Sequence, residues 1–127
     1  MSHKVFATAI NCIDGRVQVP VIDWIKKQHG IDYVDMITSP GPERLLAKGT
    51  DHSAIQSIKK FLGISVSRHQ SKLVAIAMHH DCAGNSAEDK TRAEQMLMAI
   101  KTLHSWDYNV KVIGLRVDEN WEVHEVQ

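Results

Sequence analysis

The sequence has 127 residues, a length typical of one domain, so we expect residues 1–127 to form a single domain. Fifteen Lys and Arg residues balance fifteen Asp and Glu residues. A neutral chain without basic runs lacks the attraction to phosphate behind most nucleic-acid and membrane-surface binding, so we expect neither partner. No apolar run approaches the roughly 20 residues that span a bilayer, and the first residues show no secretory signal pattern. The cytoplasm is the expected compartment.

Apolar runs and turn residues predict alternating strands and helices. Residues 5–10 form a short β-prone run, which indicates a buried strand. A helix is predicted from Pro20, with apolar residues along one side, to a stop at Gly30. A second strand covers residues 33–38. It is closed by residues 39–42, where two prolines and a glycine can continue neither a helix nor a strand.

The middle of the chain predicts a helix followed by the most buried strand. Apolar positions from Ala54 to Leu62 recur at helical spacing, with Asp51 as the candidate N-cap and Gly63 near the end. The polar residues 65–71 are predicted to form a connecting loop. Residues 73–78 are the most apolar run in the chain and indicate a central parallel strand buried on both faces.

A third helix and two further strands complete the predicted fold. Ser86 and Asp89 have the spacing of a capping box, which predicts the start of the helix. Its expected core face consists of Ala93, Met96, Leu97, Ile100 and Leu103. Residues 110–117 predict another strand, and the alternating residues 121–126 predict a final edge strand.

This order predicts an α/β fold with a mostly parallel sheet of about four strands flanked by helices, and an antiparallel edge strand at the C-terminus. Ligands of such sheets bind beyond the carboxyl ends of the strands, at the point where successive connections leave in opposite directions. Cys12 and residues 79–82 both follow a strand, so both should lie on this rim. If the first and third strands are neighbours, the two groups meet.

The residues that would meet there have the chemistry of a zinc site. Cys12, His79 and Cys82 supply two thiolates and one imidazole, a set that zinc binds tetrahedrally. Three protein ligands leave a fourth position for water or substrate, as in catalytic zinc sites. His80 is an awkward fourth ligand because it adjoins His79. Two inert buried thiols, or a redox-active Cys12–Cys82 disulfide, remain alternatives, but the disulfide leaves His79 unexplained.

Asp14 and Arg16 follow Cys12 in the same turn. In isolation such a pair would be a solvated ion pair of little energetic importance. Beside a metal, the carboxylate would coordinate the ion unless another group held it. The planar guanidinium of Arg16 can hold Asp14 in a bidentate pair and so keep the fourth position open.

These residues carry a family resemblance. Cys-x-Asp-x-Arg at residues 12–16, followed by His-x-x-Cys at residues 79–82, resembles the zinc signature of the β-class carbonic anhydrases. Residues 57–63 are similar to the family's helix before the second motif. Residues 112–118, with Val123 beyond them, are similar to its last pair of strands. The resemblance covers nearly the whole chain.

The resemblance implies a zinc enzyme acting on a small molecule. Cys12, His79 and Cys82 would bind Zn²⁺, and a zinc-bound hydroxide would attack carbon dioxide to give bicarbonate. Asp14 would orient the hydroxide and Arg16 would hold Asp14. Members of the family are generally dimers or larger assemblies, so a homodimer or higher homo-oligomer is expected. Two thiolates offset the charge of zinc, so we expect a hydration rate that rises above neutral pH.

The sequence also departs from the family pattern. The family's Arg-Asn-Ala-Gly segment after the second strand is replaced by residues 38–44, of which only Gly41 matches, and Ala83 stands where a glycine usually follows the second cysteine. Two alternatives follow. The site could hydrolyse a related molecule such as carbonyl sulfide or carbon disulfide. It could also be a non-catalytic zinc-binding domain in which Asp14 occupies the fourth position.

Overall fold

The computed structural model describes residues 4–127, so the first three residues of the predicted domain lie outside the described part. The strands are β1 (Phe6–Asn11), β2 (Tyr33–Thr38), β3 (Leu73–His79), β4 (Lys111–Val117) and β5 (Val123–Glu125). The helices are the short 3₁₀ helix η1 (Gly15–Val17), α1 (Gln18–His29), α2 (Pro42–Lys48), α3 (His52–Arg68) and α4 (Asp89–Ser105). Across residues 4–127, no helix is long and apolar enough to cross a membrane.

The strands form one sheet in the order β2-β1-β3-β4-β5. β1 runs parallel to both β2 and β3, β3 runs parallel to β4, and β5 is antiparallel to β4. The predicted α/β fold, with its antiparallel C-terminal edge strand, is therefore confirmed. The chain leaves β1 for β2 on one side and returns to β3 on the other, which places the switch point between β1 and β3.

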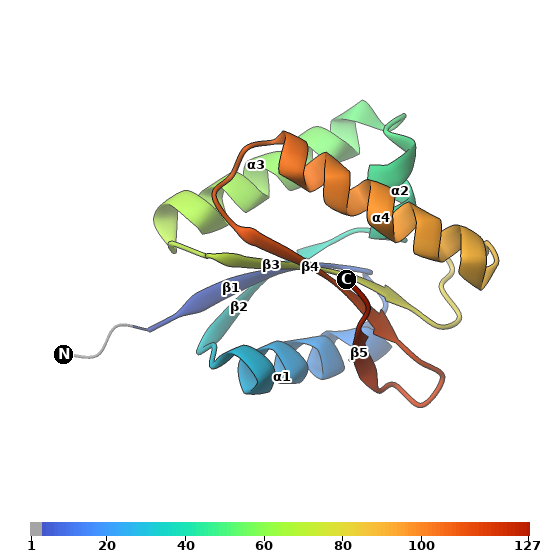
Figure 1. Cartoon of the computed structure of the whole chain (residues 1–127), viewed down its shortest axis with the longest axis horizontal. Coiled ribbons are helices and arrows are strands. Elements are labelled where there is room, and N and C mark those ends of the chain that lie inside the picture. The colour runs from blue at the N-terminus through green and yellow to red at the C-terminus, as the bar shows by residue number, and fades with distance from the viewer. Residues whose placement is uncertain (1–3) are drawn as a thin grey trace.

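Helices cover both faces of this sheet. α1 lies against one face, and α2, α3 and α4 lie against the other (Figure 1). Successive residues of a strand point to opposite faces, so β3 serves both layers. Ala75 and Ala77 pack in the core on the α1 side, whereas Val74 and Ile76 pack in the core beneath the other three helices. Every residue of β3 is buried, as expected for a central parallel strand.

Helical structure extends beyond its predicted bounds in two places. Residues 39–42 do end β2, but α2 begins at Pro42, which occupies the first helical turn, where a missing N–H is tolerated. α3 continues through residues 65–68, which were predicted to be a loop. The polar Ser65 can be buried there because its hydroxyl bonds Thr8 Oγ1 at 2.6 Å and donates to Asp35 at 2.7 Å. On the same helix, Phe61, which lies among the apolar positions at helical spacing, is 51% exposed.

The predicted start of α4 was wrong, and its predicted core face was right for Met96 and Leu103, with Ile100 partly buried against the core. The helix begins at Asp89, and neither Ser86 nor the N-cap Glu88 provides a side-chain capping bond. Ala93 and Leu97 are exposed, and the buried positions are Arg92, Met96, Ala99 and Leu103. A charged residue takes a core position because its Nη2 contacts Glu43 and donates to a backbone carbonyl, while its buried Nε has no hydrogen-bond partner among the described residues.

The loop after β2 and the loop after β3 touch through two glycines. A Cβ atom on Gly84 would lie 2.6 Å from the carbonyl carbon of Pro40 and 2.7 Å from the nitrogen of Gly41. These are backbone atoms, so a side chain at either glycine forces the two loops apart. The contact fixes residues 82–85 against the start of α2.

We therefore expect Gly84→Ala to lower the free energy of unfolding by about 1–3 kcal/mol, as overpacking does elsewhere. Gly15→Ala is the matched control, since nothing lies within 4 Å of a Cβ at that position. Chemical denaturation of both variants measures the difference. Equal stability of the two variants would show that the loops are not held by this contact.

Candidate metal centre

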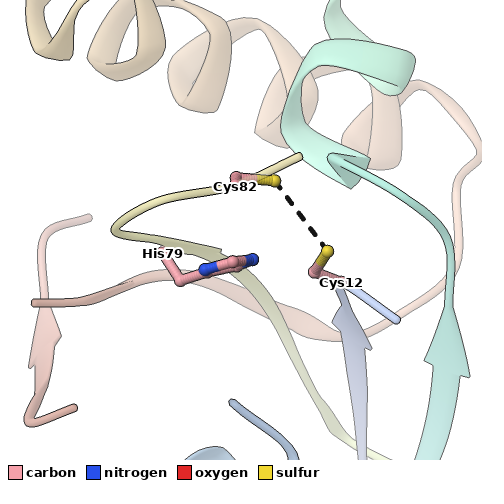
Figure 2. Close-up of side chains that lie close together, drawn as sticks. All are labelled: Cys12, His79 and Cys82. Atoms are coloured by element: carbon pink, nitrogen blue, oxygen red, sulfur yellow. Dashed lines mark hydrogen bonds between the residues drawn. The ribbon is translucent and has the colours of Figure 1, made fainter. Parts of the chain in front are cut away.

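The ends of two neighbouring strands bring together three metal-ligating side chains. Cys12 directly follows β1, His79 is the last residue of β3, and Cys82 lies in the loop after β3. Because β1 and β3 are paired in parallel, their carboxyl ends lie side by side at the switch point. Figure 2 shows the imidazole of His79 pointing toward Cys12, with Cys82 above both.

The three side chains are close enough to share one ion. Their candidate ligand atoms all lie within 4.8 Å of one another. The two sulfur atoms are 3.9 Å apart, close to the roughly 3.8 Å that tetrahedral coordination with Zn–S bonds near 2.3 Å requires. Cys12, His79 and Cys82 are 3%, 1% and 7% exposed, so the cluster is shielded from solvent.

The hydrogen bonds of His79 leave one ring nitrogen free. Its Nδ1 lies 2.6 Å from the carbonyl oxygen of His80, which can only accept, so Nδ1 carries the proton. Nε2 is then an acceptor, and it is buried without a hydrogen-bond partner in the described structure. Buried polar atoms are normally satisfied. An orphaned lone pair beside two sulfurs fits a bound cation.

The thiols of Cys12 and Cys82 give a second reason to expect a cation at this site. Burial, and next the adjacent Cys12, raises the pKa of the Cys82 thiol. A buried thiolate beside another sulfur is costly without a compensating positive charge. A metal ion supplies that charge, and its binding releases the thiol protons. Two sulfurs and one imidazole nitrogen form a donor set that suits zinc.

Asp14 lies at the edge of the cluster and is held by Arg16. Arg16 Nη2 donates to Asp14 Oδ2 at 2.7 Å, its Nε donates to Oδ1 at 3.0 Å, and its backbone N–H donates to Oδ1 at 2.9 Å. These bonds hold the pKa of Asp14 well below its usual range, so the carboxylate stays ionised. Its Oδ2 is only 4.0 Å from His79 Nε2.

Amide side chains shape the loop that carries Cys12 and Asp14. Asn11 accepts a bond from the Cys12 backbone N–H at 2.9 Å and donates to the carbonyl of Val17 at 3.1 Å. Gln18 donates to the carbonyls of Cys12 and Asp14 at 2.7 and 2.9 Å. The loop is thus tied to the first turn of α1, which limits how far Cys12 can move.

The sequence analysis missed a buried charged pair behind His79 and Cys82. Glu43 is fully buried and Arg92 is 7% exposed. Arg92 Nη2 lies 3.3 Å from Glu43 Oε1 and donates to the carbonyl oxygen of His79 at 2.7 Å. Asn85, in the loop after Cys82, also donates to Glu43 Oε1, at 2.8 Å. The pair therefore ties α2 and α4 to the segment that carries two of the three donors.

One signal for this pair was present in the sequence. Arg92 stands at helical spacing from Met96, Ala99 and Leu103, so it continues their buried stripe. Treating a charged residue as core-facing would have placed it correctly. Glu43 gives no such signal, because its burial depends on α2, which the sequence analysis did not predict.

Comparison with known proteins agrees with the fold. The family model described as "Putative carbonic anhydrase" matches residues 2–127. A search of curated proteins found no match. The chain is an α/β protein with a Cys-His-Cys cluster at its switch point, and it belongs to this carbonic anhydrase family.

Solved structures with a similar fold include β-carbonic anhydrases and proteins described simply as carbonic anhydrases. The enzyme from Streptococcus mutans has a TM-score of 0.60 at 16% identity, over 100% of this chain and 87% of that one. The β-carbonic anhydrase isoform I of Trichomonas vaginalis has a TM-score of 0.59 at 14% identity, over 98% and 86%. One of two tetrameric β-carbonic anhydrases from Sordaria macrospora has a TM-score of 0.51 at 12% identity, over 98% and 82%. At these identities the likeness is one of fold.

The buried pair makes a testable contribution to stability. Replacing one partner of a buried ion pair leaves the other charge uncompensated, at a cost of about 3–5 kcal/mol. We expect this loss for Glu43→Gln, which keeps the size of the side chain and removes its charge. Glu94→Gln, on the exposed side of α4, should change stability by less than about 0.5 kcal/mol. Equal denaturation midpoints would contradict the assignment.

Proposed function

We propose that this chain is a zinc-dependent carbonic anhydrase that interconverts carbon dioxide and bicarbonate. The observation that carries the proposal is the buried cluster of Cys12, His79 and Cys82, with its 3.9 Å sulfur separation and its free His79 nitrogen. Membership of a carbonic anhydrase family supports the same reaction. The reaction class is that of a lyase with a small-molecule substrate.

The three donors would hold Zn²⁺ through Cys12 Sγ, Cys82 Sγ and His79 Nε2, with the fourth position open. Zinc in such a site would lower the pKa of a bound water and so supply a nucleophile, although two thiolates weaken this effect by offsetting the charge of the ion. The contribution of the chain is to fix this position. The bond from His79 Nδ1 to the His80 carbonyl orients the imidazole, as outer hydrogen bonds do in other metal sites.

Asp14 would orient the attacking water. Its carboxylate is ionised at neutral pH, because Arg16 stabilises the charge, and an ionised carboxylate only accepts hydrogen bonds. A water next to the donors would donate a hydrogen bond to Asp14. This bond would point the lone pair of the water away from the carboxylate and toward the substrate. Arg16 acts as the group that holds Asp14 in this orientation.

We also propose that the chain works as one domain over residues 1–127, in the cytoplasm, as a homodimer or larger homo-oligomer. The tetrameric assembly named for the Sordaria macrospora enzymes supports the oligomer. So do the exposed apolar side chains of Ile13 and Val19, in and just after the site loop, which are 59% and 64% exposed. Burial of these side chains against a second copy would remove apolar surface from water.

Two other functions use the same cluster. Residues 38–44 differ from the family segment, which motivates hydrolysis of carbonyl sulfide or carbon disulfide by the same site. The 4.0 Å separation of Asp14 and His79 Nε2 motivates a non-catalytic zinc domain, since a small movement would put the carboxylate on the metal. We place the hydrolase behind carbon dioxide hydration because the family is described by the latter reaction, and the non-catalytic domain behind it because Arg16 holds Asp14 back.

The metal assignment predicts about one zinc ion per chain in the purified protein. Cys82→Ser should lose this zinc on dialysis against a chelator, because one of three protein ligands is replaced by a poor one. His80→Ala is the control: it removes the neighbouring imidazole, and its backbone carbonyl can still accept from His79. Elemental analysis measures the content. Zinc retained equally by the two variants would refute the ligand set.

The reaction is tested by stopped-flow hydration of carbon dioxide on protein of verified zinc content. We expect rapid hydration that rises from neutral to alkaline pH, and a loss of roughly 100-fold in Asp14→Ala, because a misplaced nucleophile loses much of its advantage. Turnover of carbonyl sulfide or carbon disulfide in the absence of hydration would favour the hydrolase. No turnover of any of the three, from fully loaded protein, would favour the non-catalytic domain.

A further inference from the structure

The hairpin between β4 and β5 reaches the Asp14–Arg16 pair. The guanidinium carbon of Arg16 lies 4.6 Å from the centroid of the Trp121 ring, the distance of a cation–π contact. Trp121 lies in the turn between β4 and β5, more than a hundred residues from Arg16 in the sequence. The sequence analysis gave it no part in the site.

The turn holds Trp121 in a specific backbone conformation. Trp121 has a φ of 61°, which is unfavourable for a bulky residue. Asp118 stabilises the turn: its carbonyl accepts the Trp121 N–H at 2.9 Å, and its Oδ1 accepts the N–H groups of Asn120 and Glu122 at 2.9 and 3.0 Å. His124 Nε2 lies 2.7 Å from the other carboxylate oxygen. A strained residue this well supported is characteristic of a functional position.

Arg16 is itself about half open to water, although its first partner Asp14 is only 20% exposed. The Arg16 side chain is 46% exposed, and that of Asp81, its second carboxylate partner at 3.3 Å, is 71% exposed. Exposed ion pairs contribute little, because water competes with them and long side chains lose rotamer freedom. An indole against one face of the guanidinium restricts those rotamers and excludes water from that face.

We propose that Trp121 is a positioning residue: by packing on Arg16, it keeps Arg16 paired with Asp14 and so keeps the Asp14 carboxylate off the metal position. This inference rests on the proposed metal centre. The carboxylate oxygen Oδ2 is 4.0 Å from His79 Nε2, so it is a competitor for any ion held by the cluster. Whether the Asp14 carboxylate binds such an ion depends on how strongly Arg16 holds it.

Two variants distinguish the aromatic contact of Trp121 with Arg16 from the space that the Trp121 side chain fills. Trp121→Phe keeps an aromatic face for the guanidinium, and Trp121→Leu keeps apolar packing without that face. The first measurement needs no metal: hydrogen exchange of the Arg16 Nε–H, followed by NMR. We expect exchange to be roughly 2- to 5-fold faster in Trp121→Leu than in the wild type, and largely restored in Trp121→Phe. Equal exchange in all three proteins would overturn the proposal.

The second measurement uses cobalt(II)-loaded protein, with azide as a probe of the open coordination position. We expect azide to bind roughly 2- to 5-fold more weakly to Trp121→Leu, because Asp14 then competes for the metal. In an Asp14→Asn background, the same Trp121→Leu change should have no effect. A loss of azide affinity that persists there would mean that Trp121 is merely structural, and would overturn the proposal.

The two measurements also distinguish this inference from the proposed function. Failure to hydrate carbon dioxide, with azide affinity still coupled to Trp121 through Asp14, would overturn the activity and leave the positioning role standing. Failure to bind cobalt(II) would overturn both. Normal hydration with unchanged exchange and azide affinity in Trp121→Leu would overturn the positioning role alone.

Discussion

The parallel pairing of β1 with β3 is the constraint on which the candidate site depends. Ala9 pairs with Ala75 and Ile10 with Ile76, so the ends of the two strands are fixed relative to each other by backbone hydrogen bonds between buried residues. Because Cys12 follows β1 and His79 ends β3, the pairing also fixes the positions of these two residues relative to each other. A one-residue shift in register would exchange the two faces of a strand. The donors could then no longer converge on one point.

The charged residues around the cluster occur as pairs. Arg16 holds Asp14 on one side, and Arg92 holds Glu43 behind the His79–Cys82 segment. Two thiolates would cancel the charge of a zinc ion, so an unpaired carboxylate nearby would either bind the metal or repel the thiolates. Each arginine also bonds the backbone of the loop after β3 or the end of that strand, Arg16 at Asp81 and Arg92 at His79. The pairs thus neutralise charge and fix the loop together.

Local patterns predicted the individual strands and helices, and the rule that ligands bind beyond the carboxyl ends of parallel strands then placed the donors together. The apolar run of β3 and the position of Cys12 just after β1 were enough to place the donors on one rim. Helical spacing indicates the burial of Arg92, but its partner Glu43 and the contact of Trp121 could not be found in this way. Glu43 is buried only because α2 lies over the loop after β3, and Trp121 meets Arg16 only because β5 folds back on β4. Both depend on contacts between distant segments, for which single-sequence patterns carry no information.

Residues 38–44, the segment that departs most from the family pattern, have a structural role that the sequence did not reveal. Gly41 makes the close contact with Gly84, Pro42 starts α2, and Glu43 reaches Asn85 and Arg92. Each of these interactions supports the loop that carries Cys82. Residues 38–44 therefore brace the loop that carries Cys82 from the side of α2. Their departure from the family pattern is compatible with the convergence of Cys12, His79 and Cys82 on one point.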